Sequence, residues 1–182
     1  SSSSVQQNNM VFSHFSYEDN NIPYLPFGAG FVNSTQFEFK YNDFTQMQGG
    51  ILKKTVANYF KNTGTSSIAS NESYGNKYTG VAFASVSNYQ NRDNSGLGLK
   101  FTCNTNLNNT MADYIIYNEN PTGNDGIADY QGDVSNATTT SAKDIFSKTT
   151  GGSFCNIINI PTHTITWFCD GVHGLPNCKQ GL

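Results

Sequence analysis

The sequence predicts a mainly β (α+β) fold: antiparallel sheets with one short amphipathic helix, in a single domain stapled by disulfide bonds. Three observations favour this class. Charged residues make up only 13% of the 182 residues and aromatic residues another 13%, and Thr, Tyr and Phe favour pleated, half-buried strands. Apolar residues recur at every second position in several segments. Four cysteines in a polar chain indicate a disulfide framework in an oxidising compartment, and therefore a secreted domain.

The chain is long enough for one domain with its own core and does not require two. Residues 1–9 open with four serines, and we expect them to form a flexible N-terminal segment. We expect residues 10–182 to form a single β-rich extracellular domain. No positively charged start precedes an apolar stretch, so any signal peptide is expected to have been removed. No internal repeat is evident.

Alternating apolar residues predict the strands in chain order. The first strand region is marked by Phe31, Phe37, Phe39 and Tyr41. The segments from Tyr78 to Tyr89 and from Leu97 to Cys103 flank residues 91–96, which are typical of a turn. This arrangement predicts a hairpin.

The C-terminal half contains three further strand candidates. Met111 to Tyr117 is a short apolar run typical of a buried strand. Phe154 to Ile160 and Thr164 to Cys169 flank Pro161-Thr162-His163 and predict a second hairpin.

One segment departs from strand spacing. Ile51 to Lys61 carries its apolar residues at helical intervals, and Gly64 lies beyond its end as a stop signal. These apolar residues are Leu52, Val56, Tyr59 and Phe60. The spacing predicts an amphipathic helix of about three turns.

The four cysteines allow three disulfide pairings. Local spacing favours Cys169–Cys178, because a turn built from Asp170, Gly171 and Gly174 separates them. That choice leaves Cys103–Cys155 to join two strands. Four buried thiols in a cytosolic protein are the alternative interpretation.

Charge and hydropathy exclude two classes of partner. The net charge is -3, and the lysines are scattered apart from the adjacent Lys53 and Lys54, so a nucleic-acid surface is not expected. No apolar run approaches the roughly 20 residues that a membrane-spanning helix needs.

No constellation of catalytic or zinc-binding residues is evident. The chain lacks a Gly-x-Ser-x-Gly motif, and nothing in the spacing of its acidic residues selects a carboxylate pair. It also lacks a Cys-x-x-Cys pair, so the spacing fits no compact zinc site. The candidate zinc ligands are Cys155, His163, Cys169, His173 and Cys178. We therefore predict no catalytic residues and no firm metal site.

Calcium is the one cofactor that the sequence does not exclude. The acidic, Gly-containing loop from Asn118 to Asp129 provides oxygen ligands, and a Gly helps such a loop to wrap around an ion. The candidate ligands are Asn124, Asp125, Asp129 and Asp133. Aligned on Gly126, however, the ligand positions of an EF-hand fall on Pro121, Gly123 and Gly132. An ordinary Asn/Asp/Gly turn is the favoured interpretation.

The C-terminal residues carry a resemblance to a known family. A strand reading Ile165-Thr166-Trp167-Phe168-Cys169 is followed by a short loop and Leu175-Pro176-Asn177-Cys178, and this resembles the C-terminal disulfide loop of bacterial type IV pilins and minor pilins. The resemblance implies a filament subunit in which the loop is exposed. It assigns surface contacts to Asp170, Gly171, His173, Leu175 and Pro176. The long hydrophobic N-terminal helix of such subunits is absent here, so the chain corresponds to a head domain.

These observations favour a non-catalytic extracellular structural or adhesive domain, as the subunit or head domain of a surface filament. Its expected partners are other subunits, a surface receptor or a glycan. A lectin-like carbohydrate-binding β-sandwich, dependent on calcium through loop residues 118–133, is the alternative. A secreted hydrolase is the third class, but the sequence assembles no convergent site for it.

Overall fold

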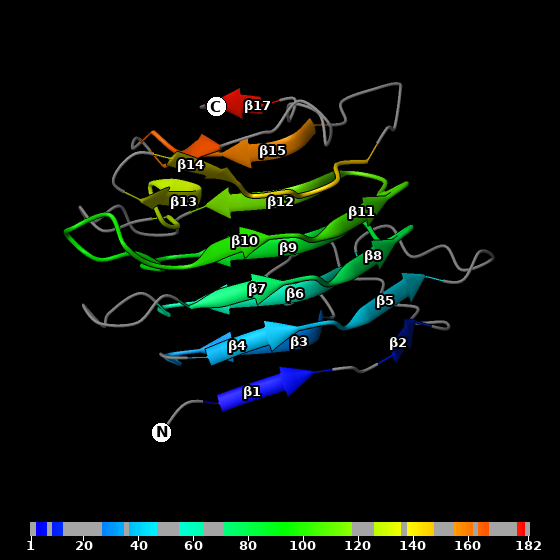
Figure 1. Cartoon of the computed structure of the whole chain (residues 1–182). Helices are drawn as coiled ribbons and strands as arrows, with labels where there is room; N and C mark the ends of the chain where they lie inside the picture. Colours follow the sequence, from blue (N-terminus) through cyan, green and yellow to red (C-terminus); the bar gives the residue numbers. More distant parts are fainter. Residues whose placement is uncertain are drawn as a thin grey trace.

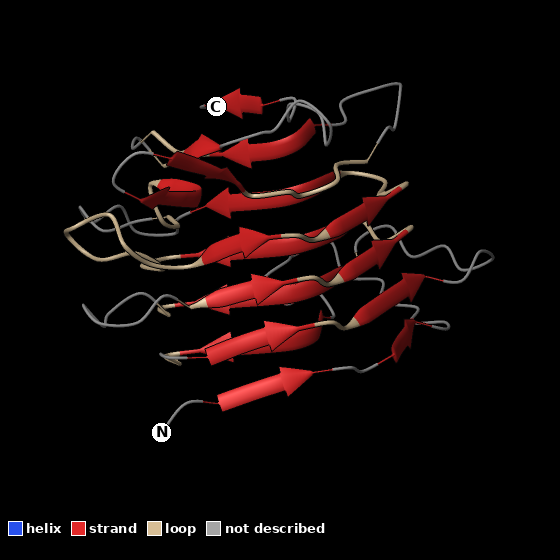
Figure 2. Cartoon of the chain, in the orientation of Figure 1, coloured by secondary structure: helices blue, strands red, loops and turns tan. Residues whose placement is uncertain are grey.

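The computed structural model describes residues 3–6, 9–12, 27–34, 37–46, 55–63, 71–117, 126–135, 138–147, 155–161, 164–167 and 178–180. Every regular element in these ranges is a β-strand (Figure 2). Accordingly, no described helix has the length and apolar character that crossing a bilayer requires.

Most strands belong to three sheets that run along one axis (Figure 1). Sheet A contains β1 (Ser3–Gln6), β4 (Phe37–Lys40), β7 (Glu72–Tyr74) and β10 (Lys100–Thr102). Sheet B contains β2 (Asn9–Phe12), β5 (Asp43–Gln46), β8 (Lys77–Thr79) and β11 (Thr105–Leu107). Sheet C contains β3 (Phe27–Val32), β6 (Val56–Lys61), β9 (Phe83–Asn88), β12 (Ala112–Tyr117), β15 (Cys155–Asn159) and β17 (Cys178–Gln180).

The chain visits sheets A, B and C in turn and then returns to sheet A one strand further along. Strands β4, β5 and β6 form one such coil, and β7, β8 and β9 form the next. Neighbouring strands within each sheet are parallel. The described residues therefore form a β-solenoid, in which each coil packs on the coils before and after it.

A smaller sheet lies next to β10 near the C-terminal end. It contains β13 (Tyr130–Ser135), β14 (Thr138–Ser141) and β16 (Thr166–Trp167). β13 pairs with β14 in antiparallel fashion and with β16 in parallel. Among the strands that the structure describes, the β13–β14 pair is the one antiparallel ladder.

The prediction of antiparallel sheets is therefore wrong. β9 and β10, which the sequence placed in one hairpin, do not pair: β9 lies between β6 and β12, and β10 pairs with β7. β15 and β16, from the second predicted hairpin, also pair with other strands. Alternation identifies the buried face of a strand but not its neighbour. Residues 91–96 do form a tight turn, which an antiparallel bridge between Arg92 and Gly98 closes, but this turn is a corner loop of the solenoid and does not join β9 and β10 as a hairpin.

The predicted helix from Ile51 to Lys61 is also wrong. Its second half, Val56–Lys61, is strand β6, and residues 51–54 lie outside the described residues. Asn58 and Phe60 are fully buried, whereas Tyr59 and Lys61 are half-buried. This two-residue period belongs to a strand, and the helical spacing of the apolar residues is coincidental. At the N-terminus, Ser3–Gln6 pairs with β4 within the segment expected to be flexible.

Aromatic rings stack along the solenoid axis because residues in register on successive coils lie about 4.8 Å apart. Phe44 and Tyr78 are in register on β5 and β8, and their ring centroids are 5.5 Å apart. Near the C-terminal end, the ring of Tyr114 stacks on Phe101 at 4.6 Å and on Trp167 at 5.6 Å. These stacks occupy the interior, where Phe44, Tyr78, Phe101 and Tyr114 are fully buried.

A ladder of buried polar side chains runs beside the rings, at the corner between sheets A and B. The backbone N–H and Nδ2 of Asn42 both donate to Oδ1 of Asn76, each at 2.9 Å. The same two groups of Asn76 donate to Oδ1 of Asn104, at 3.0 and 3.2 Å. The N–H of Asn104 donates to Oδ1 of Asp144 at 2.8 Å. Each rung satisfies backbone groups at a buried corner, where unpaired groups would be costly.

The ladder changes from amide to carboxylate at its last rung. Asp144 is buried, and its Oδ2 accepts a hydrogen bond from the indole Nε1 of Trp167 at 3.2 Å. Burial raises the pKa of Asp144 to about 7, against the opposing effect of hydrogen bonds from Asn104, Trp167 and Tyr114. A second buried carboxylate, Asp113, accepts hydrogen bonds from the Nδ2 of Asn156 and the N–H of Ser147. Its pKa is also raised by burial.

Candidate binding surface

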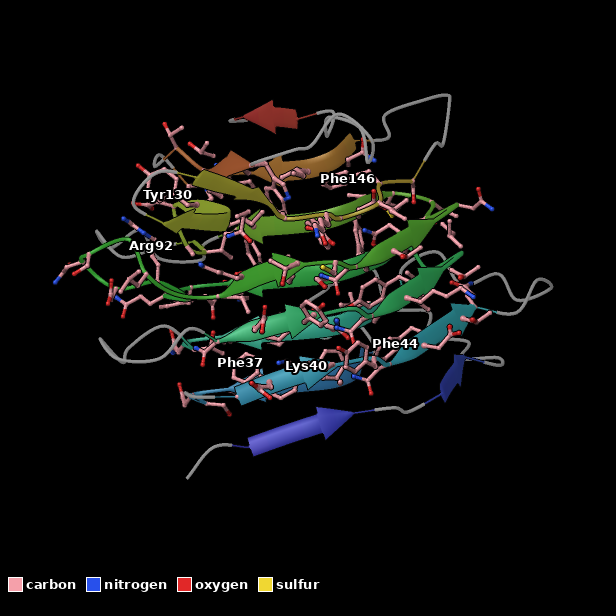
Figure 3. All side chains as sticks on the ribbon, in the orientation of Figure 1. Phe37, Lys40, Phe44, Arg92, Tyr130 and Phe146 are labelled. Atoms are coloured by element: carbon pink, nitrogen blue, oxygen red, sulfur yellow. The ribbon has the colours of Figure 1, made fainter. Side chains whose placement is uncertain are left out.

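The outward side of sheet A carries two rows of charged and polar side chains. On β4, β7 and β10 the residues Phe37, Phe39, Ser73 and Phe101 point inward and are buried. The residues between them face outward: Glu38, Lys40, Glu72, Tyr74, Lys100 and Thr102. We call these six residues the sheet A face. In Figure 1 this sheet lies at the front and no described element covers it, and Figure 3 places Lys40 there.

Parallel register aligns the sheet A face into two rows along the solenoid axis. Glu38, Glu72 and Lys100 are in register with one another on β4, β7 and β10. The second row is Lys40, Tyr74 and Thr102. Residues that are far apart in the sequence therefore become lateral neighbours.

Lys40 is the centre of an ion network that holds both glutamates. Its Nζ lies 3.1 Å from Glu38 Oε1 and 3.5 Å from Glu72 Oε2. The other oxygen of Glu72 accepts a hydrogen bond from Thr102 Oγ1 at 2.8 Å. Desolvation lowers the pKa of Lys40, but hydrogen bonds and charge interactions with Glu38 and Glu72 outweigh it, and the net pKa is raised. Lys40 therefore keeps its positive charge throughout the physiological pH range.

Two tyrosines and a cysteine extend this surface toward sheet B. Tyr41 is 53% exposed, and its ring meets that of Tyr74 edge-on, with centroids 5.5 Å apart. The Tyr74 ring also lies 5.5 Å from Lys40 Nζ, in a cation–π contact. The neighbouring side chain of Cys103 is the main cause that raises the pKa of Tyr74 to about 12, and Tyr41 adds to this effect.

Gly75 makes room for the Tyr41 ring. It has a φ of 62°, in the left-handed region, and a Cβ built on it would lie 2.8 Å from Cε1 of Tyr41. We expect Gly75→Ala to lower the free energy of unfolding by about 1–2 kcal/mol, because both the backbone and the ring are strained. Urea denaturation followed by circular dichroism measures this loss. In a Tyr41→Asn background the loss should shrink to that of the backbone alone, and an equal loss in both backgrounds would contradict the packing of Tyr41 on Gly75.

The outward sides of the other sheets differ from the sheet A face. On sheet B, Lys77 pairs with Asp43 at 3.6 Å, and the exposed Leu107 and Ile145 lie further along the axis. On sheet C, Val56, Phe83, Val86 and Ala112 form a separate buried apolar cluster. At one end of sheet C, Lys61 Nζ also lies 5.0 Å from the ring of Tyr89. Sheet A differs in that its lysine is paired with two glutamates beside the exposed ring of Tyr41.

The predicted calcium ligands do not form a described site. Asp129 instead pairs with Arg92: Nε lies 3.0 Å from Oδ1, and Nη2 donates to Oδ2 at 3.2 Å. Asp133 is on β13, and Asn124 and Asp125 lie outside the described residues. No group of three or more His, Cys, Asp or Glu residues in the described ranges is arranged to hold a metal ion.

The Arg92–Asp129 pair anchors the corner loop that carries Gly96, whose carbonyl accepts a hydrogen bond from the N–H of Asp129 at 3.0 Å. The side chains of Arg92 and Asp129 are only 12% and 31% exposed. We expect Arg92→Ala to lower the free energy of unfolding by about 1–3 kcal/mol, since it leaves a half-buried carboxylate without its partner. The matched control is Lys77→Ala, which removes an exposed pair and should cost less than about 1 kcal/mol. Equal losses would show that burial does not strengthen the Arg92 pair.

The predicted disulfides have different outcomes. Cys103 is a free thiol, so its predicted link to Cys155 is not formed in the structure. Cys103 lies at the corner after β10, whereas Cys155 is on β15 of sheet C, in register with Ala112. Cys178 is on β17, and its predicted partner Cys169 lies outside the described residues.

The predicted contact loop also lies outside the described residues, which exclude Asp170, Gly171, His173, Leu175 and Pro176. His163 is outside them as well. Of the residues that carry the resemblance to pilins, Ile165, Thr166 and Trp167 have described side chains, and Trp167 is at the end of β16. The resemblance to pilins and minor pilins stays a prediction.

No protein-family model, curated protein or solved structure matches the chain. Its functional interpretation therefore depends on the residues themselves.

Sequence reasoning missed the sheet A face, although a signal for it exists. Three segments place an outward residue, a corner residue and a ladder asparagine in the same order. These segments are Lys40-Tyr41-Asn42, Tyr74-Gly75-Asn76 and Thr102-Cys103-Asn104. The corner residues Tyr41, Gly75 and Cys103 all have positive φ values, 57°, 62° and 55°. Aligning the chain on these asparagines would have placed the sheet A residues side by side.

Proposed function

We propose that this chain is a non-catalytic extracellular domain with a structural and adhesive role. The observation that supports the proposal is that the following ionisable groups are engaged in contacts within the structure. The buried carboxylates of Asp113 and Asp144 are engaged by donors that join successive coils. On the outward side of sheet A, Lys40 is paired with both Glu38 and Glu72. Such an arrangement supports a rigid surface for contact.

The ladder and the ring stacks explain how this surface stays rigid. Hydrogen bonds from Asn42 to Asp144 connect four coils in one line. A solenoid built in this way is stabilised by the interfaces between neighbouring coils and presents an extended lateral surface. An extended, firmly held surface suits repeated weak contacts, whose combined strength exceeds that of each contact alone.

An adhesion assay tests the proposal. Beads coated with the chain are allowed to settle on cell surfaces and on surfaces coated with the same chain, and their detachment is measured under increasing shear. We expect them to resist a higher shear than beads coated with albumin on at least one of these surfaces. Equal detachment would overturn the adhesive role, and release of products from a panel of glycans or peptides would overturn the non-catalytic assignment.

A further inference from the structure

We infer that the sheet A face, together with Tyr41, binds an uncharged polysaccharide chain that runs along the solenoid axis. This inference rests on the proposed adhesive function and names its ligand. It depends on three properties of the surface: a fixed aromatic ring, carboxylates with spare acceptor capacity, and a balanced charge.

The aromatic ring is Tyr41. It is 53% exposed, yet its position is fixed by the edge-on contact with Tyr74 and by the absence of a side chain at Gly75. The apolar C–H face of a sugar ring packs on an aromatic ring of this kind. A ring that is already held in place loses little conformational entropy when a ligand binds.

The carboxylates are those of Glu38 and Glu72. They would accept hydrogen bonds from the hydroxyl groups of the sugar. A carboxylate has about four lone-pair sites. Lys40 occupies one oxygen of each glutamate, and Thr102 occupies the second oxygen of Glu72. The side chains of Glu38 and Glu72 remain 50% and 28% exposed. They are oriented by the network and still have sites for hydrogen-bond donors from solvent.

The charge of the sheet A face favours an uncharged ligand. Glu38 and Glu72 contribute two negative charges, and Lys40 and Lys100 contribute two positive charges, so their sum is zero. A polyanion or polycation would gain little from such a surface. The two rows run across parallel strands about 4.8 Å apart. This spacing is comparable with one sugar ring per coil, so successive rings of a polysaccharide lying along the axis meet successive coils, with a glutamate on β4 and on β7 and a lysine on β10 in the first row.

A sedimentation assay with insoluble polysaccharides tests the inference. The probes are cellulose, chitin and mixed-linkage β-glucan as uncharged chains and calcium alginate as a polyanion. We expect at least one uncharged polysaccharide to retain the protein, with an affinity that changes little when salt is raised to about 1 M, because no net charge is paired. No retention by any of them, or retention by alginate alone, would overturn the inference.

Variants localise the binding. Tyr41→Asn removes the ring but keeps a residue that adopts positive φ, as Asn33 and Asn62 do here at 51° and 54°. We expect it to weaken binding about tenfold or more. Glu72→Gln keeps the shape of the side chain and should also weaken binding, so it provides a second test if Tyr41→Asn does not fold. The control is Lys77→Ala on sheet B, which should bind as the wild type does.

Wild-type affinity in both Tyr41→Asn and Glu72→Gln would overturn the inference. The outcomes for this inference and for the proposed function are separable. Beads that adhere to cells or to one another, combined with a lack of binding to every uncharged polysaccharide, would refute the ligand and leave the adhesive role in place.

Discussion

Replacing the central asparagine of the ladder, Asn76→Leu, is expected to lower the free energy of unfolding by about 3–5 kcal/mol. Leucine has the same number of side-chain heavy atoms and the same branching, but it can neither accept nor donate a hydrogen bond. The substitution removes the acceptor of the Asn42 N–H and the donor to the Phe39 carbonyl, which Asn76 Nδ2 reaches at 2.8 Å. It also removes the donor to Asn104 Oδ1. All of these groups are buried, so water cannot replace the lost partners.

Urea denaturation followed by circular dichroism measures this loss, with Asn94→Ala as the control. Asn94 is exposed in the corner loop, and its substitution should change the free energy of unfolding by less than about 0.5 kcal/mol. A loss below about 1 kcal/mol for Asn76→Leu would contradict the ladder as a main stabilising feature. The loss is a large share of the total, since domains are stable by only about 5–15 kcal/mol.

The sequence predicted strands well where one face is buried. Phe37, Phe39 and Phe101 alternate with polar residues, and they lie on β4 and β10 with their rings in the interior. Met111 to Tyr117 was expected to be a buried strand, and β12 occupies Ala112–Tyr117. Alternation reports burial directly, because side chains of a strand point to opposite faces in turn.

The partners of these strands could not be predicted in the same way. Hairpin rules assume that strands close in sequence pair, whereas a solenoid pairs strands one coil apart. The rungs of the ladder are separated by 34, 28 and 40 residues, from Asn42 to Asn76, Asn104 and Asp144. Coils of such different length hide the repeat from any search for a fixed period.

The candidate surface was missed for the same reason. Lys40 and Glu72 belong to different coils, and only the parallel register of β4 and β7 brings them together. Asp129 shows the converse error. Its sequence context suggested a calcium ligand, but Arg92, the single arginine of the chain, occupies its carboxylate. An oxygen-rich loop identifies candidate ligands without showing which cation they bind.

The acidic end of the ladder should make the stability of the protein depend on pH. Burial raises the pKa of Asp144 from 3.8 to about 7. The folded protein therefore keeps this proton up to about pH 7, whereas the unfolded chain releases it near its ordinary pKa of 3.8. Below that pH both states are protonated and the group costs nothing. Between the two values the unfolded state binds fewer protons, so the free energy of unfolding falls as pH rises.

The total fall has an upper limit of about 4 kcal/mol and is complete above about pH 7. Urea denaturation at pH values from about 4 to 8 measures it. Asp144→Asn keeps an acceptor for the N–H of Asn104 and removes the titrating group, so the fall should be much smaller. A residual fall is expected from Asp113, whose pKa is raised by the same cause. In the control, Asp43→Asn, which alters an exposed ion pair with Lys77, the fall should match that of the wild type. If the free energy of unfolding of Asp144→Asn fell with pH as much as that of the wild type, the pH dependence would belong to another group. If the free energy of unfolding of the wild type rose with pH over this range, the hydrogen bonds to Asp144 would outweigh the effect of its burial.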